Sequence, residues 1–378
     1  MKPPVRLVLD WRNAHRIVIH TSKYRAFDGT VGHGGRIRVI ADLISVVRNT
    51  VDVPIVVVQK GFQSFEVTEA DGTTVIGIKA GLNARGDHQL GRGLSRILKA
   101  EDGLLYASGA QGAYPYYFEG AKGLQHGIGW DGPYGSLHRG YHNRINLAFS
   151  KAMSQILTVD TNFINWLRQQ GVPGISLTEK CHYVPNYADL NALGDPPEAR
   201  GAHTPLRILY ARRFDQKRGP TLFLDTLAVL QELGVDFQAR MFSVGGHDEL
   251  VAALAERDLS ARVSLHEASM SEILAEYAWA DLSVVPTIWS EGTSLAAVES
   301  ICAGVPVITT PVGGLANVVV PKFNGDVVAP TASALARAVV LASEKETYRN
   351  LRANCISMRP ALGKVRWEAA VRDFLFGT

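Results

Sequence analysis

The chain has 378 residues and a formal net charge of +3, and its residues are 46% hydrophobic, 20% charged and 8% aromatic. The composition is that of a globular protein, and the length suggests two or three domains, which excludes a disordered or fibrous chain. The nearly balanced charge gives no whole-chain indication of nucleic-acid binding, so we expect no nucleic-acid partner.

The sequence also lacks the marks of a membrane-spanning or secreted protein. It has no run of about 18 apolar residues, and Asp10 and Arg12 cut the first apolar stretch too short for a signal peptide. Cys181, Cys302 and Cys355 form no CxxC or Cys/His spacing, which excludes a disulfide framework and a structural zinc site. We therefore expect a cytoplasmic protein.

In the first half of the chain, short β-branched segments alternate with helical patterns. Asp71-Gly72 predicts a β-hairpin turn within 68–74. The other segments predict a parallel sheet covered by helices on both faces. We expect strands at 16–22, 54–60, 74–80, 103–109, 123–129, 155–160 and 181–186, with helices that include 36–47 and 162–170.

A stretch rich in Pro, Gly and charge, 193–207, reads as a linker, after which the alternation restarts. We therefore predict an α/β fold of two doubly wound, Rossmann-like domains, 1–192 and 208–359, with the ligand in a cleft at the carboxyl ends of the strands. A final segment, 360–378, combines a Pro/Gly interruption at 360–363 with a helical pattern. The second domain is expected to contain strands at 207–211, 238–244, 262–268, 281–287 and 306–310 and helices at 221–233, 249–258, 271–280 and 295–304.

Two glutamates in the stretch 290–314 have the spacing of a ligand site. Glu291 precedes Gly292, which lets the backbone turn closely, and a helix is predicted to start near Ser294. Glu299 then falls on the second turn of that helix. Free N–H groups at the helix start suit a phosphate, and a carboxylate suits the vicinal hydroxyls of a ribose. Spacing alone leaves open the alternative that both glutamates are solvated.

This stretch resembles the retaining glycosyltransferases of the two-domain GT-B fold, family 4, also called glycosyl transferases group 1. The resemblance rests on Glu291, Glu299, Ala303-Gly304-Val305-Pro306-Val307, Gly313-Gly314 and Asn324-Gly325. The first half matches more loosely, at Gly34-Gly35, His126 and 185–190. The resemblance implies a GT-B fold and transfer of a sugar from a nucleotide-diphosphate sugar, and it implies that segment 360–378 packs back on the first domain.

The resemblance also implies roles for individual residues. Glu291 and the amides of the residues after it, Gly292, Thr293, Ser294 and Leu295, contact the transferred sugar, and Glu299 binds the ribose of the donor. Gly34 and Gly35 let the backbone approach the donor phosphates, and His126 bonds the donor sugar near the reacting carbon. Thr293 and Ser294 replace the usual Phe-Gly, which leaves the donor sugar open, and Asn317 stands where the family usually has Glu.

Histidine alone is weak evidence, because a single His is more often a packing residue than a catalytic one. His126 is favoured because Gly127, Gly129, Trp130 and Asp131 beside it indicate a loop of close approach. His33, next to the glycine pair, is the second candidate.

A basic segment after the first strand of the second domain offers cations for the donor pyrophosphate. The family has an Arg at this strand end and a Lys five residues later. Arg213 with Arg218, or Arg212 with Lys217, fits that spacing. Phe214 and Gly219 favour the first pair, Ala211 favours the second, and a merely basic surface loop is the third alternative. We predict Arg213 and Arg218, with Lys217 as a further donor-binding residue.

No metal or cofactor is expected. The sequence has no Asp-x-Asp to hold a divalent ion and no P-loop, and the segment 31–36 lacks the last glycine of a dinucleotide loop. Protein cations and helix dipoles must then neutralise the pyrophosphate.

The first fifty residues hold nine Lys and Arg against three Asp. This excess fits either a solvated face or docking to an anionic membrane, where each basic residue contributes about 1 kcal/mol. Similar transferases often use lipid-linked acceptors. We therefore predict a retaining, metal-independent glycosyltransferase that acts on a glycan or lipid-linked acceptor in surface polysaccharide assembly. It would work in the cytoplasm or at the inner face of the membrane. A nucleotide-sugar epimerase or hydrolase, or a silent nucleotide- or glycan-binding protein, remains the alternative.

Overall fold

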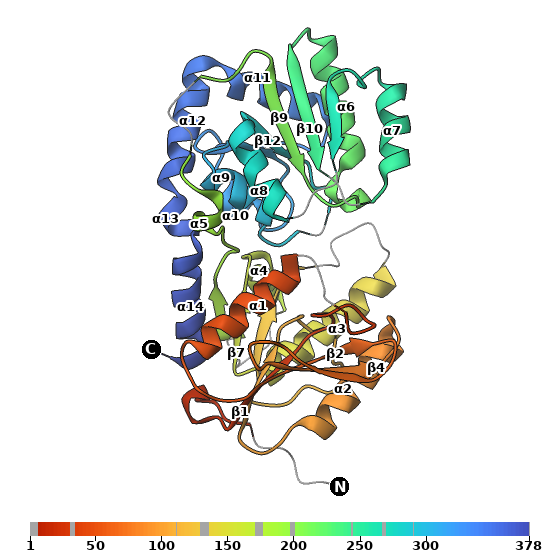
Figure 1. Ribbon diagram of the computed structural model, residues 1–378, viewed down its shortest axis with the longest axis vertical. Coiled ribbons are helices and arrows are strands. Elements are labelled where there is room, and N and C mark those ends of the chain that lie inside the picture. Colours follow the sequence, from red (N-terminus) through yellow and green to blue (C-terminus); the bar gives the residue numbers. More distant parts are fainter. Residues whose placement is uncertain are drawn as a thin grey trace. The chain divides into compact units, whose positions relative to one another are not determined.

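The computed structural model describes residues 7–30, 35–110, 112–128, 136–170, 177–196, 201–242, 245–266, 270–289 and 291–377. The chain divides into two compact units (Figure 1). The first unit contains Met1–His126, Pro133–Val184 and Glu368–Thr378, and the second contains Gly127–Gly132 and Pro185–Trp367.

The first unit is built on a sheet of eight strands in the order β3-β4-β2-β1-β5-β6-β7-β8. Its strands pair in parallel except β3 with β4, which are antiparallel and joined by the hairpin expected at Asp71-Gly72. The strands are β1 (Arg16–His20), β2 (Ile55–Gly61), β3 (Phe65–Thr68), β4 (Thr74–Lys79), β5 (Asp102–Tyr106), β6 (Lys122–Gln125), β7 (Gln155–Thr158) and β8 (Cys181–Tyr183).

Helices and short helical turns connect these strands. They are η1 (Trp11–Asn13), α1 (Gly35–Arg48), α2 (Ala84–Ile97), α3 (Ser136–Ala152), α4 (Asn162–Gln169) and η2 (Leu177–Lys180). The strand expected at 123–129 ends earlier, at Gln125. Gly127, with φ +95°, turns the chain out of the extended conformation just beyond it.

The second unit has a six-stranded parallel sheet in the order β11-β10-β9-β12-β13-β14. Two separate, largely parallel sheets confirm the predicted α/β class. The strands are β9 (Leu206–Ala211), β10 (Phe237–Phe242), β11 (Val263–His266), β12 (Leu282–Val285), β13 (Val307–Thr309) and β14 (Gly325–Val327).

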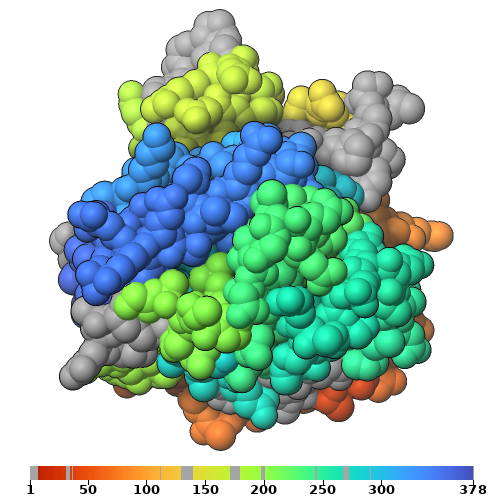
Figure 2. Space-filling view, turned by 90° about the horizontal axis from the view of Figure 1, so that it is seen from above, coloured from red at the N-terminus to blue at the C-terminus, as the bar shows by residue number. Residues whose placement is uncertain are grey.

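The helices of the second unit follow the expected alternation with the strands. They are α5 (Leu190–Leu193), η3 (Gln216–Arg218), α6 (Pro220–Glu232), α7 (His247–Glu256), α8 (Met270–Trp279), α9 (Leu295–Cys302), α10 (Leu315–Val318), α11 (Ala332–Ser343), α12 (Lys345–Ser357) and α13 (Arg359–Leu362), while α14 (Lys364–Phe376) begins in this unit and continues into the first. Figure 2 looks onto this unit, where α6 (green) lies beside both the blue helix α11 and the teal helix α7.

The interruption expected at 360–363 is mostly a short helix instead. Pro360 lies in the first turn of α13. A first-turn proline is tolerated because its missing N–H has no partner within the helix there.

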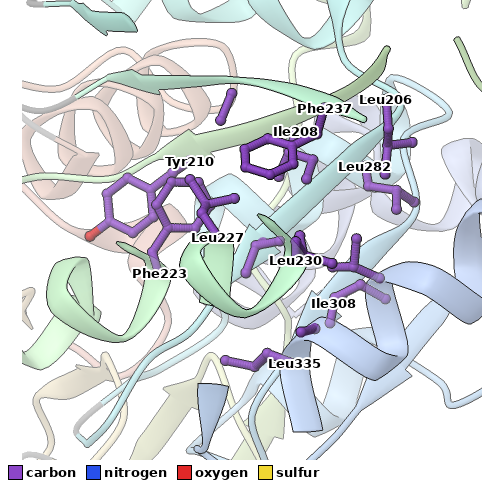
Figure 3. Close-up of a cluster of buried hydrophobic side chains, with 14 of the residues drawn as sticks. Leu206, Ile208, Tyr210, Phe223, Leu227, Leu230, Phe237, Leu282, Ile308 and Leu335 are labelled. Carbon is purple, nitrogen blue, oxygen red and sulfur yellow. The ribbon is translucent and has the colours of Figure 1, made fainter. Parts of the chain in front are cut away.

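A buried apolar cluster holds β9 in place, and this positions the site described below. Tyr210 on β9 and Phe223 on α6 are both fully buried, with ring centroids 4.9 Å apart (Figure 3). Leu227 and Leu230 continue the same face of α6 at helical spacing. The residues that follow β9 therefore leave the sheet from a rigid base.

The C-terminal helix α14 contributes side chains to both cores. Trp367 packs on Tyr187 of the second unit, with ring centroids 4.2 Å apart. In the first unit, Lys122 Nζ donates to the carbonyl of Phe374 at 2.7 Å, and Phe376 meets Trp11 edge to face. Among the described residues, no helix has both the length and the apolar character needed to cross a bilayer.

Candidate active site

Glu291, just before α9, is the centre of a buried ion-pair cluster. Arg212, which follows β9, and Arg218, in η3, each donate from a terminal guanidinium nitrogen to Oε2 of Glu291. Thr287 Oγ1 donates to the same oxygen at 3.3 Å. Glu291 is only 9% exposed, which excludes the alternative of a solvated carboxylate.

The two arginines respond differently to this environment. For Arg212, burial disfavours the charged form, but the attraction of Glu291 outweighs it and raises the pKa. For Arg218, burial dominates and lowers the pKa, because Glu291 offsets only part of the effect and Arg212 repels it. The cluster of two guanidinium groups and one carboxylate carries a net positive charge.

The start of α9 lies directly against this cluster. Ser294 is the N-cap residue, as its Oγ accepts from the backbone N–H of Ala297 at 3.5 Å. Arg212 donates to the same Oγ from its other terminal nitrogen. The N–H groups of the first turn of a helix provide partial positive charge for an anion. The N–H groups at the start of α9 and the two arginines therefore both favour the binding of an anion.

Glu299 lies on the second turn of α9, as its spacing predicted, but it is buried rather than solvated. Its exposed fraction is 2%, and the hydroxyl of Tyr277 on α8 donates to its Oε2 at 3.2 Å. No sequence pattern selects Tyr277, since the packing of α8 against α9 brings it there.

Glycines allow the loops of the site to approach one another. Gly313 has φ +59°, and a Cβ built on it would overlap the backbone of Glu291. Gly314 N–H donates to the carbonyl of Glu291 at 3.3 Å. Gly219, with φ +70°, would place a Cβ 2.0 Å from the carbonyl oxygen of Pro286. The loop that carries Arg218 thereby packs closely on Pro286, and the Gly313-Gly314 turn packs closely on Glu291.

The basic segment takes an arrangement that neither expected register describes. Arg212 and Arg218, one from each register, meet at Glu291, whereas Arg213 is exposed. Lys217 lies in η3, where its N–H bonds Asp215 Oδ1 at 3.0 Å and its carbonyl accepts from Ile288. Successive side chains at a strand end point to opposite sides, so Arg212 is buried when Arg213 is exposed.

In the first unit, only part of the expected site can be placed. Gly35 begins α1, while Gly34 and His33 lie outside the described residues. His126 follows β6 and is half-buried, and its Nε2 donates to the carbonyl of Ala107 at 2.8 Å.

The donor set does not suggest a metal centre. Across the part of the chain that the structure describes, no three His, Cys, Asp or Glu side chains gather in a way that could hold an ion. The structure also brings the Thr287 hydroxyl to Glu291 and the Tyr277 hydroxyl to Glu299.

The second unit, which contains Glu291 and Glu299, is similar to known proteins. Residues 196–358 match the model of the family described as Glycosyl transferases group 1. The D-inositol 3-phosphate glycosyltransferase of Xylanimonas cellulosilytica is 30% identical over 167 residues, which are 39% of this chain and 39% of that protein. The amylovoran biosynthesis glycosyltransferase AmsK of Erwinia amylovora is 27% identical over 146 residues, 37% of this chain and 36% of that protein. The matches thus span less than half the length of these curated relatives.

The whole chain is similar to solved structures. The Anabaena protein Alr3699/HepE, solved with UDP and glucose, matches with a TM-score of 0.73 and 14% identity over 96% of this chain and 100% of that chain. These findings define the class of the protein as a GT-B fold with two parallel α/β sheets. Within this class, residues 196–358 of the chain are similar to the glycosyl transferases group 1 family.

Proposed function

We propose that the protein is a retaining glycosyltransferase that moves a sugar from a nucleotide-diphosphate sugar to a hydroxyl of a glycan or lipid-linked acceptor. The observation that carries the proposal is the buried Glu291, held by Arg212 and Arg218 at the start of α9, within the segment that matches the family. A carboxylate next to cations and helix N–H groups suits a ligand with both hydroxyls and phosphates.

Each group in the second unit has a proposed task. Arg213, Arg218 and Lys217 bind the donor pyrophosphate, helped by the amides of the α9 start. Glu291 and the backbone from Gly292 to Leu295 contact the transferred sugar, and Glu299 accepts the ribose hydroxyls. The hydrogen bond from the Tyr277 hydroxyl supports this role for Glu299, because it orients the carboxylate.

The first unit is proposed to hold the acceptor. Gly34 and Gly35 let the backbone approach the donor phosphates, and His126 bonds the sugar near the reacting carbon. The acceptor hydroxyl attacks the anomeric carbon from the face that the pyrophosphate leaves, through an oxocarbenium-like transition state. The new bond joins acceptor oxygen and anomeric carbon, the bond from that carbon to the phosphate oxygen breaks, and the phosphate oxygen takes the acceptor proton. The protein positions both substrates and stabilises charge on the leaving pyrophosphate.

Relatives suggest where to look for the substrates. AmsK is named for amylovoran biosynthesis, and Alr3699/HepE was solved with UDP and glucose. We therefore propose a role in cell-surface polysaccharide assembly, in the cytoplasm or at the inner face of the membrane, and UDP-sugars as the first donors to test.

A donor panel tests the proposal. UDP-, GDP- and dTDP-sugars are screened by thermal unfolding, because a ligand at 100 times its Kd adds about 2.7 kcal/mol to the free energy of unfolding. The stabilising donor is then incubated with and without a glycan or lipid-linked acceptor. Product that forms only with acceptor supports a transferase. Donor consumption without acceptor indicates an epimerase or hydrolase, and binding without turnover indicates a silent binding protein.

A further inference from the structure

We infer that Arg212 is a positioning residue that orients Glu291 and the start of α9, and that it is not a ligand of the donor phosphates. The inference rests on the proposed function, in which Glu291 contacts the transferred sugar. It separates the role of Arg212 from that of its neighbour Arg213.

The guanidinium group of Arg212 is already bonded to protein oxygens. Arg212 is only 8% exposed. One terminal nitrogen donates to Ser294 Oγ, and the other donates to Glu291 Oε2 and, at 3.4 Å, to Thr287 Oγ1. Both terminal nitrogens therefore already bind protein oxygens, whereas a phosphate ligand must offer its donors outward.

The two carboxylate oxygens of Glu291 differ in how many protein donors they accept from. Oε2 accepts from Arg212, Arg218 and Thr287. No described residue donates to Oε1. A carboxylate held through one oxygen cannot rotate to use both, so Glu291 is set to accept one substrate hydroxyl through Oε1.

Arg212 also joins the Glu291 carboxylate to the N-terminus of α9. Ser294 caps α9, and Glu291 lies three residues before it. One planar guanidinium bonded to both sets the distance between the sugar-binding carboxylate and the helix start. Lysine has one nitrogen and cannot reproduce this fork.

Binding of a nucleoside diphosphate separates the two roles, because UDP has phosphates but no sugar. We expect Arg212→Met to leave the Kd for UDP within about twofold of wild type, while kcat with the UDP-sugar falls by about 10- to 100-fold, as for a lost charged hydrogen bond. Arg212→Lys should recover only part of that loss. Ser294→Ala, which keeps the Arg212–Glu291 pair, should lose less than Arg212→Met.

Arg352→Lys is the matched control. Arg352 is another buried arginine of the second unit, 3% exposed, and it bonds the carbonyl of Gly304 just beyond the opposite end of α9 at 2.8 Å. This variant should lower thermal stability without the loss of kcat. If Arg212→Met fails to fold, Arg212→Lys and Ser294→Ala provide the same comparison.

A double-mutant cycle completes the test. If Arg212 acts through Glu291, Arg212→Met combined with Glu291→Gln should lose no more kcat than the worse single variant. A Kd for UDP that rises tenfold or more in Arg212→Met, or multiplicative losses in the cycle, would overturn the inference. A wild-type protein that transfers no sugar from any donor would instead count against the proposed function.

Discussion

Gly313 lies so close to Glu291 that a Cβ built on Gly313 would stand 1.8 Å from the carbonyl oxygen of Glu291. The two residues come from loops that follow adjacent strands, β13 and β12. Gly313 also has φ +59°, a conformation that favours glycine. The backbone of Glu291 is thus held in place by the Gly-Gly turn, while its side chain is held by the arginines.

The first prediction follows from this contact. Gly313→Ala adds a methyl group where the Glu291 carbonyl already lies, so it should lower the free energy of unfolding by more than the roughly 1–3 kcal/mol of an unfavourable backbone angle. Gly234→Ala is the control, since Gly234 has φ +71° but no atom within 4 Å of the added Cβ. Urea denaturation of both variants measures the difference. Equal losses would show that the close approach carries no cost.

The second prediction separates the two glutamates. Glu299→Ala should raise the Kd for the donor by about one to two decades, because it removes a charged hydrogen bond to the ribose worth roughly 1.5–3 kcal/mol. Glu291→Ala should mainly lower kcat. Glu276→Ala, which removes a carboxylate paired with Arg240 elsewhere in the unit, should do neither. Calorimetric titration and steady-state kinetics give both values, and an unchanged donor Kd in Glu299→Ala would remove its role.

The third prediction concerns the exposed and half-buried cations. Arg213→Ala and Arg218→Ala should each lower turnover by about 10²–10³-fold, the loss typical of a donor to developing negative charge. Arg213→Ala should also weaken UDP binding, because its exposed guanidinium is free to reach the pyrophosphate. Lys217→Ala should lose less turnover than either arginine variant. Full activity in all three variants would contradict the phosphate assignment.

The fourth prediction is metal independence. The sequence has no Asp-x-Asp, and the described residues contain no cluster fit to hold an ion. Charge on the pyrophosphate is then neutralised by arginines and helix N–H groups. Turnover should therefore be the same in excess EDTA as in added Mn²⁺ or Mg²⁺. Activity that disappears with EDTA and returns with either metal would refute this.

The fifth prediction concerns acid stability. His20, at the end of β1, is fully buried, and burial lowers its pKa to about 4 while Nε2 bonds the carbonyl of Gly112 at 3.1 Å. Below the ordinary pKa near 6.5, the unfolded chain binds a proton at His20 before the folded protein does. The free energy of unfolding should therefore fall as the pH drops from about 6.5 to about 4, by up to about 3 kcal/mol for this group. His20→Gln should show a shallower fall, and identical pH profiles would contradict the assignment.

Local pattern was sufficient for much of the fold. Alternation of apolar strands with helical segments predicted two parallel sheets, since the period of the apolar residues reports the secondary structure directly. The spacing from Glu291 to Glu299 and the helix start predicted near Ser294 likewise placed Glu291 just before α9 and Glu299 on its second turn. These features depend on residues close together in the chain.

What the sequence by itself could not determine was which residues meet across the second unit. Arg212 and Arg213 are the same residue type and adjacent in the sequence, so the sequence does not distinguish them. Only one of the two side chains can point inward at the end of β9, and the packing of that strand places Arg212 against Glu291. The Tyr277–Glu299 bond and the approach of Gly313 to Glu291 join residues 22 positions apart. Contacts of this kind arise from the order of the strands and the packing of helices on them, so they exist only in the tertiary structure.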